Sequence, residues 1–139
     1  MANISKYLAD VMIDKLLRNQ VYTPPATVYL ALFTAVTGLD DDNPSAEVQA
    51  PGANGYARAA MALDAGVDGV SANTDIEDFT ASGSGWSAVT HCAIVDHATA
   101  VDWGTGVHVL MWGALDVAKT AGVGDTIRFI AGALDITIT

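Results

Sequence analysis

The stretch that decides the fold is TVYLALFT, residues Thr27–Thr34. In an extended strand successive side chains point to opposite faces, and here both faces are apolar. A strand without a polar face must be covered on both sides, so we expect it at the centre of a sandwich or beneath a helix. The two sets are Val28, Leu30 and Leu32 on one face and Tyr29, Ala31 and Phe33 on the other.

Upstream of this strand the chain has the pattern of one amphipathic helix, about residues 4–19. Asn3 or Ser5 can cap its start, and Asn19 is suited to a left-handed stop. Two consecutive prolines further on forbid any continuation. The apolar positions recur at spacings of three and four residues, which is the helical period. They are Ile4, Tyr7, Leu8, Val11 and Leu16.

Downstream, the pattern predicts strands and no further helix. Residues 35–55 hold three consecutive aspartates, two prolines and three glycines, which is typical of a long exposed loop. The expected architecture is mainly β: an antiparallel, jelly-roll-like β-sandwich over about residues 26–139, behind one N-terminal amphipathic helix, in a single domain of residues 1–139. The expected later strands are Tyr56–Leu63, Thr74–Phe79, Trp86–Asp96, Val107–Leu115, Thr126–Ile130 and Leu134–Ile138.

The charge of the chain excludes several classes of partner. Its 139 residues include 6 Lys and Arg against 16 Asp and Glu, for a net charge of −10. Such an acidic chain cannot neutralise a run of phosphates and is repelled by an anionic membrane surface. A single cysteine excludes an intrachain disulfide and a thiolate zinc site. Asp10 and Asp14 interrupt any apolar signal segment, so we expect folding in a cytoplasm.

Candidate catalytic and metal-binding residues gather between positions 91 and 108. His91, Cys92 and Asp96 lie close in sequence, and a Cys–His pair can act as nucleophile and base. Neighbours on a strand point to opposite faces, so we expect a core cysteine and a surface histidine. His91, His97 and His108 could meet across a hairpin and bind zinc, although no fixed ligand spacing supports such a site. We therefore expect no catalytic residue, metal or cofactor, with a small metal-dependent hydrolase as the alternative.

The acidic loop and the tryptophans are further candidates. Asp40–Asp42 and Asn43 could supply oxygen ligands to calcium, but the offsets of a helix–loop calcium site are absent. A solvated acidic loop is the expectation, and calcium binding stays open. Trp112 lies in an apolar segment and is expected in the core. Trp86 and Trp103 are candidates for a binding surface or a subunit contact, because tryptophan is favoured at both.

Four segments carry a family resemblance. They are TPPATVYLALFT at 23–34, GYAR at 55–58, GWSAVTH at 85–91 and GDTIRF at 124–129. In this order and over nearly the whole chain, the sequence resembles a family of small structural (virion) proteins of tailed bacteriophages. Members of that family are described as tail-fibre-like or head-decoration proteins.

The resemblance implies a non-enzymatic virion protein that is assembled in the host cytoplasm. The first expectation is a capsid cement or decoration protein that stabilises the head. Its partners would be the major capsid protein and sister copies in a homotrimer, with no nucleic acid and no membrane. The alternative is a tail-fibre or baseplate component involved in host recognition. The expected contact surface joins the helix and two tryptophans: Tyr7, Val11, Leu16, Trp86 and Trp103.

Overall fold

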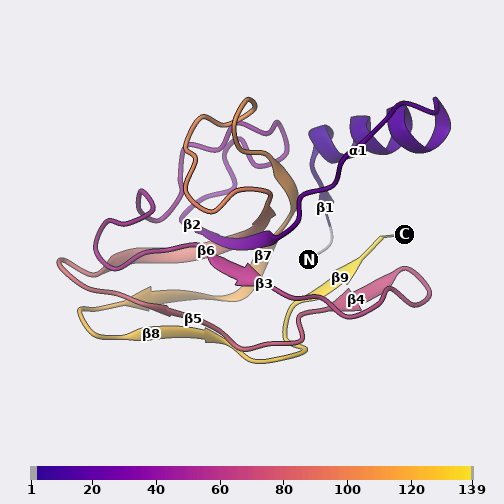
Figure 1. Cartoon of the computed structure of the whole chain (residues 1–139). Helices are drawn as coiled ribbons and strands as arrows, with labels where there is room; N and C mark the ends of the chain where they lie inside the picture. The colour runs from indigo at the N-terminus through magenta and orange to yellow at the C-terminus, as the bar shows by residue number, and fades with distance from the viewer. Residues whose placement is uncertain (1–2, 139) are drawn as a thin grey trace.

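A computed structural model describes residues 3–138 of the chain. A short helix near the N-terminus precedes a body built of antiparallel strands (Figure 1). The elements in chain order are β1 (Asn3–Ile4), α1 (Lys6–Met12), the π-helical turn η1 (Ile13–Leu17), β2 (Val28–Phe33), β3 (Ala59–Met61), β4 (Val70–Ala72), β5 (Glu77–Thr80), β6 (Trp86–Val95), β7 (Val109–Ala121), β8 (Thr126–Phe129) and β9 (Asp135–Thr137).

The strands form one large sheet and two small ones. The large sheet has the order β1-β7-β6-β2-β3, and the small sheets are the two-stranded ribbons β4–β9 and β5–β8. All of these pairings are antiparallel. The fold is therefore mainly β with one short N-terminal helix, as predicted. Its second layer consists of two separate ribbons.

Strand β2 lies inside the large sheet, between β6 and β3, and both of its faces are buried as the sequence predicted. Leu30 and Leu32 belong to a large apolar cluster on one face. Ala31 and Phe33 belong to a smaller cluster on the other face. The two ribbons close the large cluster, to which they contribute Phe79, Ile127 and Ile136.

Loops close the smaller cluster. Leu39 from the 35–55 loop is fully buried there, and the Phe33 and Trp103 rings lie 6.0 Å apart between centroids. The 35–55 segment is irregular, as predicted, but the expectation that it is exposed throughout is wrong. Asp42 is 7% exposed, and Val48, also 7% exposed, packs into the large cluster, because this loop covers sheet surface that would otherwise meet water.

Several strand boundaries differ from the sequence prediction. Strand β7 continues to Ala121, well past the predicted end at Leu115. The prediction missed this part of the strand because residues 116–120 are exposed and lack the apolar alternation that marks a half-buried strand. Between Val89 and His91 the register of β6 against β7 shifts, so β7 bulges there. Strand β4 was not predicted at all. The Tyr56–Leu63 candidate reduces to the three residues of β3.

Glu77 on β5 is an unusual buried carboxyl group. It is 4% exposed, and its Oε1 atom has no hydrogen-bond partner among the described residues. Burial raises the pKa of Glu77 above its ordinary value, and the carboxylates of Asp75 and Asp78 raise it further. Because the folded protein holds this proton more tightly than the unfolded chain, protonation of Glu77 favours folding.

The free energy of unfolding should therefore contain a contribution from Glu77 that is present below the ordinary carboxyl pKa of 4.5 and is lost as the pH rises through the raised value. We expect Glu77→Gln to be more stable than the wild type at pH 7 and close to it at pH 4. Urea unfolding of both proteins at the two pH values measures this difference. A difference that does not change with pH would contradict the account, and the subtraction removes the contributions of all other carboxyl groups.

Candidate interaction site

The start of the helix is fixed firmly to the body. The Leu8 N–H donates to Ser5 Oγ at 3.1 Å, which makes Ser5 the predicted N-cap. The Ser5 N–H donates to Leu110 O at 3.0 Å, and the Lys6 N–H donates to Asp40 O at 2.9 Å. The Lys6 ammonium also contacts the Asp41 carboxylate, which raises the pKa of Lys6. These bonds hold the first turn against β7 and the acidic loop.

Tyr7 adds an aromatic contact to this anchor. Its ring stacks on His108, with centroids 3.7 Å apart and planes at 3°. His108 Nδ1 lies 2.6 Å from Asp42 Oδ2, and the Val109 N–H donates to Asp42 Oδ1 at 2.6 Å. Asp42 thus uses both oxygens to hold β7 beneath the helix. The predicted solvated character of the acidic loop is wrong for this residue.

The second half of the helix has no such support. Figure 1 shows the helix projecting from the body beyond its first turns. Its end is well formed: Arg18 donates to Asp14 at 2.6 Å, and Asn19 has the left-handed φ of 56° that was predicted for a stop. The apolar residues of this segment lie in water. Their exposed fractions are 50% for Ile13, 73% for Leu16 and 79% for Leu17, and Val21, just after the helix, is 90% exposed.

The predicted contact residues divide into two groups. Leu16 is exposed, and Tyr7 and Val11 are half-buried on the same helix. Trp86 is 6% exposed and donates its Nε1–H to Asn54 O at 3.0 Å, so it is a core residue with almost no surface for a partner. The interface prediction is corrected at that position.

Trp103 is half-buried, and a cation occupies one face of its ring. The Arg58 guanidinium carbon lies 4.9 Å from the ring centroid. Arg58 also donates to both oxygens of Glu47 at 2.8 Å and to the carbonyls of His97 and Ala100 at 2.9 Å. Its side chain is fully buried. This cluster joins the 35–55 loop to the 96–107 loop over the smaller apolar cluster.

The histidine candidates do not meet. His91 faces Ala114 across the sheet, whereas His108 faces Asp96, whose N–H donates to His108 O at 3.2 Å. The two strands pair as predicted, but His91 and His108 lie at different positions along them and are not opposite each other. His97 Nδ1 accepts from the N–H groups of Thr99 and Ala100. Within residues 3–138 no group of three His, Cys, Asp or Glu side chains could hold a metal ion.

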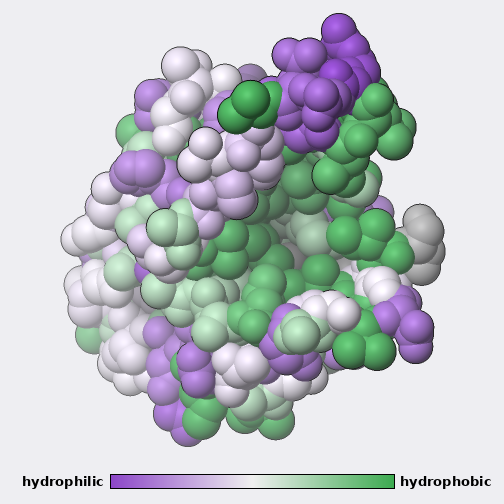
Figure 2. All heavy atoms as spheres, turned by 45° about the vertical axis from the view of Figure 1, so that its right-hand side comes forward, coloured by the Kyte–Doolittle hydropathy of each residue, from purple (hydrophilic) through white to green (hydrophobic). Residues whose placement is uncertain are grey.

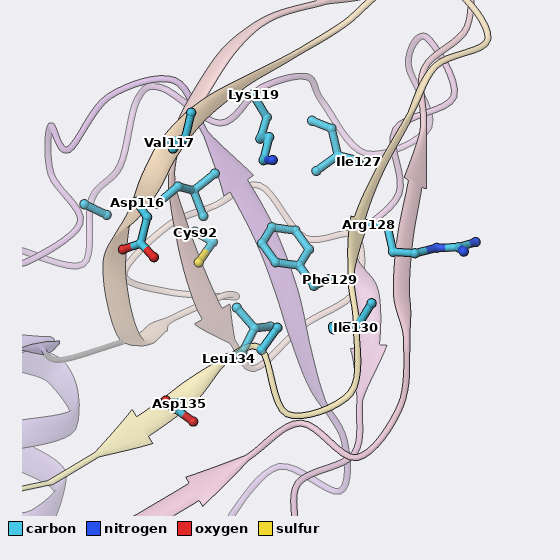
Figure 3. A pocket seen from close by; sticks show the side chains of 13 residues that line it. Cys92, Asp116, Val117, Lys119, Ile127, Arg128, Phe129, Ile130, Leu134 and Asp135 are labelled. Carbon is cyan, nitrogen blue, oxygen red and sulfur yellow. The ribbon is translucent and has the colours of Figure 1, made fainter.

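Cys92 is buried in the large cluster, on the opposite side of β6 from His91, as predicted. Burial raises the pKa of the Cys92 thiol to about 11, so it is protonated at neutral pH. It lies at the base of a hollow of about 570 Å³ between β7, β8 and the loop before β9 (Figure 3). Apolar side chains from β8 point into this hollow, whereas Arg128 points away and pairs with Asp78 at 2.6 Å.

One finding concerns membranes: across residues 3–138, the structure contains no helix with the length and apolar character needed to cross a bilayer. The fold and site define a mainly β protein with an exposed apolar helix, and exposed apolar surface of this kind is typical of contact sites on proteins. The comparison with protein families gives the particular group. The chain belongs to the Gp80 family, described as podophage GP4 fiber I protein gp80, whose family model matches residues 3–137. A search of curated proteins found no match.

Arg58 belongs to the GYAR segment, residues 55–58, that contributed to the resemblance. The sequence analysis did not identify it as a buried structural cation. Removing the Arg58 side chain should leave the Glu47 carboxylate buried without a cation, with the Tyr56 hydroxyl still donating to it at 2.8 Å. We expect Arg58→Ala to lose about 3–5 kcal/mol of unfolding free energy, the usual cost of breaking a buried ion pair. The matched control is Arg128→Ala, which removes an exposed pair and should change stability little. Equal losses in the two variants, measured by urea unfolding, would show that the Arg58 cluster does not hold the loops.

Proposed function

We propose that this chain is a non-enzymatic structural subunit of a phage tail fibre and that its projecting helix attaches it to its neighbours. The observation that carries the proposal is the exposure of the helix beyond Met12. The core closes on both faces of β2 without these residues. Three apolar side chains of the helix, at 50–79% exposure, have no role inside the subunit.

The energetics favour burial of this helix in a contact. Fully burying one leucine side chain contributes about 1.5–3 kcal/mol, so Leu16 and Leu17 together could anchor a moderately tight interface. A helix of this length is also marginal when it stands alone in water. Packing against a partner would therefore stabilise the helix as well as the complex.

The fibre assignment is favoured over the capsid cement reading by the family membership. The matching family is described by a fibre protein of a podophage, and no head protein enters that description. The cement reading from the sequence rested on the resemblance alone. A fibre subunit also agrees with the low share of charged residues, 16%, which suits a protein with much of its surface in contacts.

Copy number separates the two readings. A fibre subunit should be present at a small fraction of the major capsid protein, because a virion has one tail and many capsid subunits. Quantitative mass spectrometry of purified virions measures this ratio. A ratio near one would contradict the fibre proposal and support a lattice-wide decoration protein.

The helix contact has its own test in the virion. Leu16→Asp should reduce incorporation into particles at least about tenfold, because a charge at the centre of an apolar contact is costly to desolvate. The control is Val123→Asp, which changes an equally exposed valine in the turn between β7 and β8. Circular dichroism of both purified variants checks the fold. Normal incorporation of a folded Leu16→Asp protein would exclude the helix as the attachment element.

A further inference from the structure

The exposed helix overlooks an apolar hollow on the same face of the molecule. In Figure 1 the helix stands above the ribbon β4–β9, with β1 between them. Figure 2 shows this face as a concave surface lined with apolar residues, below a helix whose outer side is polar and whose inner side is apolar. Below the helix in Figure 1 lies the acidic hairpin, residues 62–72, which contains β4.

The acidic hairpin, like the outer part of the helix, is exposed to water and is not covered by other parts of the described chain. Residues 62–70 are all exposed, including Leu63 at 38%, Val67 at 66% and Val70 at 43%. The hairpin is nevertheless well ordered by its own bonds, since Asp64 accepts from Ser71 Oγ at 2.9 Å and from the Ala72 N–H at 2.8 Å. The helix and the hairpin therefore both carry apolar side chains that are exposed to water.

The charges of the helix and the acidic hairpin are opposite. The helix carries Lys6, Lys15 and Arg18 against Asp10 and Asp14, a net charge of +1. Lys6 pairs with Asp40 and Asp41, and Arg18 pairs with Asp14, so Lys15 is the cation that the helix offers to a partner. The acidic hairpin carries Asp64 and Asp68 and no cation. Hydrogen bonds from Ala72 and Ser71 lower the pKa of Asp64, so its carboxylate stays ionised at neutral pH.

We propose that a second copy of this chain occupies the hollow, with its helix seated against the acidic hairpin of the first copy. The proposal rests on the function proposed above and names the partner of the helix. Because the helix and the hairpin belong to one chain and lie on one face, a two-fold axis brings each helix opposite the hairpin of the other copy. The two contacts are then identical.

Charge complementarity selects a second copy as the occupant. Two bodies of net charge −10 repel one another over most of their surfaces. The helix has a net charge of +1 and offers Lys15, so it meets less repulsion from an acidic copy than the rest of the body does. The apolar residues on the helix and the hairpin would then supply the free energy of association, and the charges would set its orientation.

The experiment is sedimentation equilibrium of the full chain at micromolar concentrations, where dimers with a useful affinity are visible. We expect the wild type to form dimers at moderate ionic strength, where salt screens the repulsion between two bodies of net charge −10. Leu16→Gln/Leu17→Gln should raise the dissociation constant at least about tenfold, since glutamine keeps helix propensity and removes the apolar contact. Val123→Ser, in the turn between β7 and β8, is the control and should dimerise normally.

A charge exchange tests the orientation. One variant is Lys15→Glu. The other is Asp64→Asn/Ala65→Lys/Asp68→Asn, in which asparagine keeps the hydrogen bonds of position 64 and tolerates the left-handed φ of 52° at position 68. Each variant alone should dimerise poorly, whereas an equimolar mixture should form heterodimers, because each helix then meets a hairpin of opposite charge.

Three outcomes would overturn the self-contact: a wild type that stays monomeric, dimers that survive the double leucine substitution, or variants that fail to restore each other. None of these would bear on the fibre function itself. If the wild-type chain is monomeric yet Leu16→Asp still prevents incorporation into virions, the helix binds a different virion protein. The two proposals therefore fail separately.

Discussion

Strand β2 has two apolar faces, and the rest of the structure is arranged to cover them. One face is closed by the two ribbons, whose Phe79, Ile127 and Ile136 reach the large cluster. The other face has no sheet to meet, so two loops fold over it. Loops carry unpaired backbone groups and cannot cover a core unless something fixes them. The Arg58 guanidinium supplies that restraint, with four hydrogen bonds that converge from both loops.

Because the core closes in this way, the helix is left free for another role. Its first turn is bound tightly through Ser5 and Lys6 and through the stacked rings of Tyr7 and His108. That anchor sets the direction in which the remaining turns project. A rigid attachment with an apolar tip suits a fibre subunit, which must bind its neighbours in one fixed geometry. The same anchor places the tip on the same side of the molecule as the acidic hairpin and the apolar concave face. This placement favours a second copy as the partner.

The sequence could predict whatever depends on local periodicity. The alternation of TVYLALFT predicts a strand buried on both faces, and Ser5 and Asn19 mark the two ends of the helix. Features that depend on distant partners could not be predicted. The sequence predicts Trp86 at the surface because it follows a glycine turn, but in the folded chain its indole N–H donates to Asn54 O, which is distant in sequence. Likewise the sequence predicts a solvated Asp42, because its partners His108 and Val109 are far from it along the chain.

The central claim is that the core is complete without the outer part of the helix. Leu16→Ala and Leu32→Ala make the same chemical change at an exposed and at a fully buried position. In urea unfolding of the chain at high dilution, the account predicts a loss of less than about 0.5 kcal/mol for Leu16→Ala. It predicts a loss of about 2–5 kcal/mol for Leu32→Ala. Comparable losses would contradict the account, because they would show that the helix tip is part of the core of the isolated subunit.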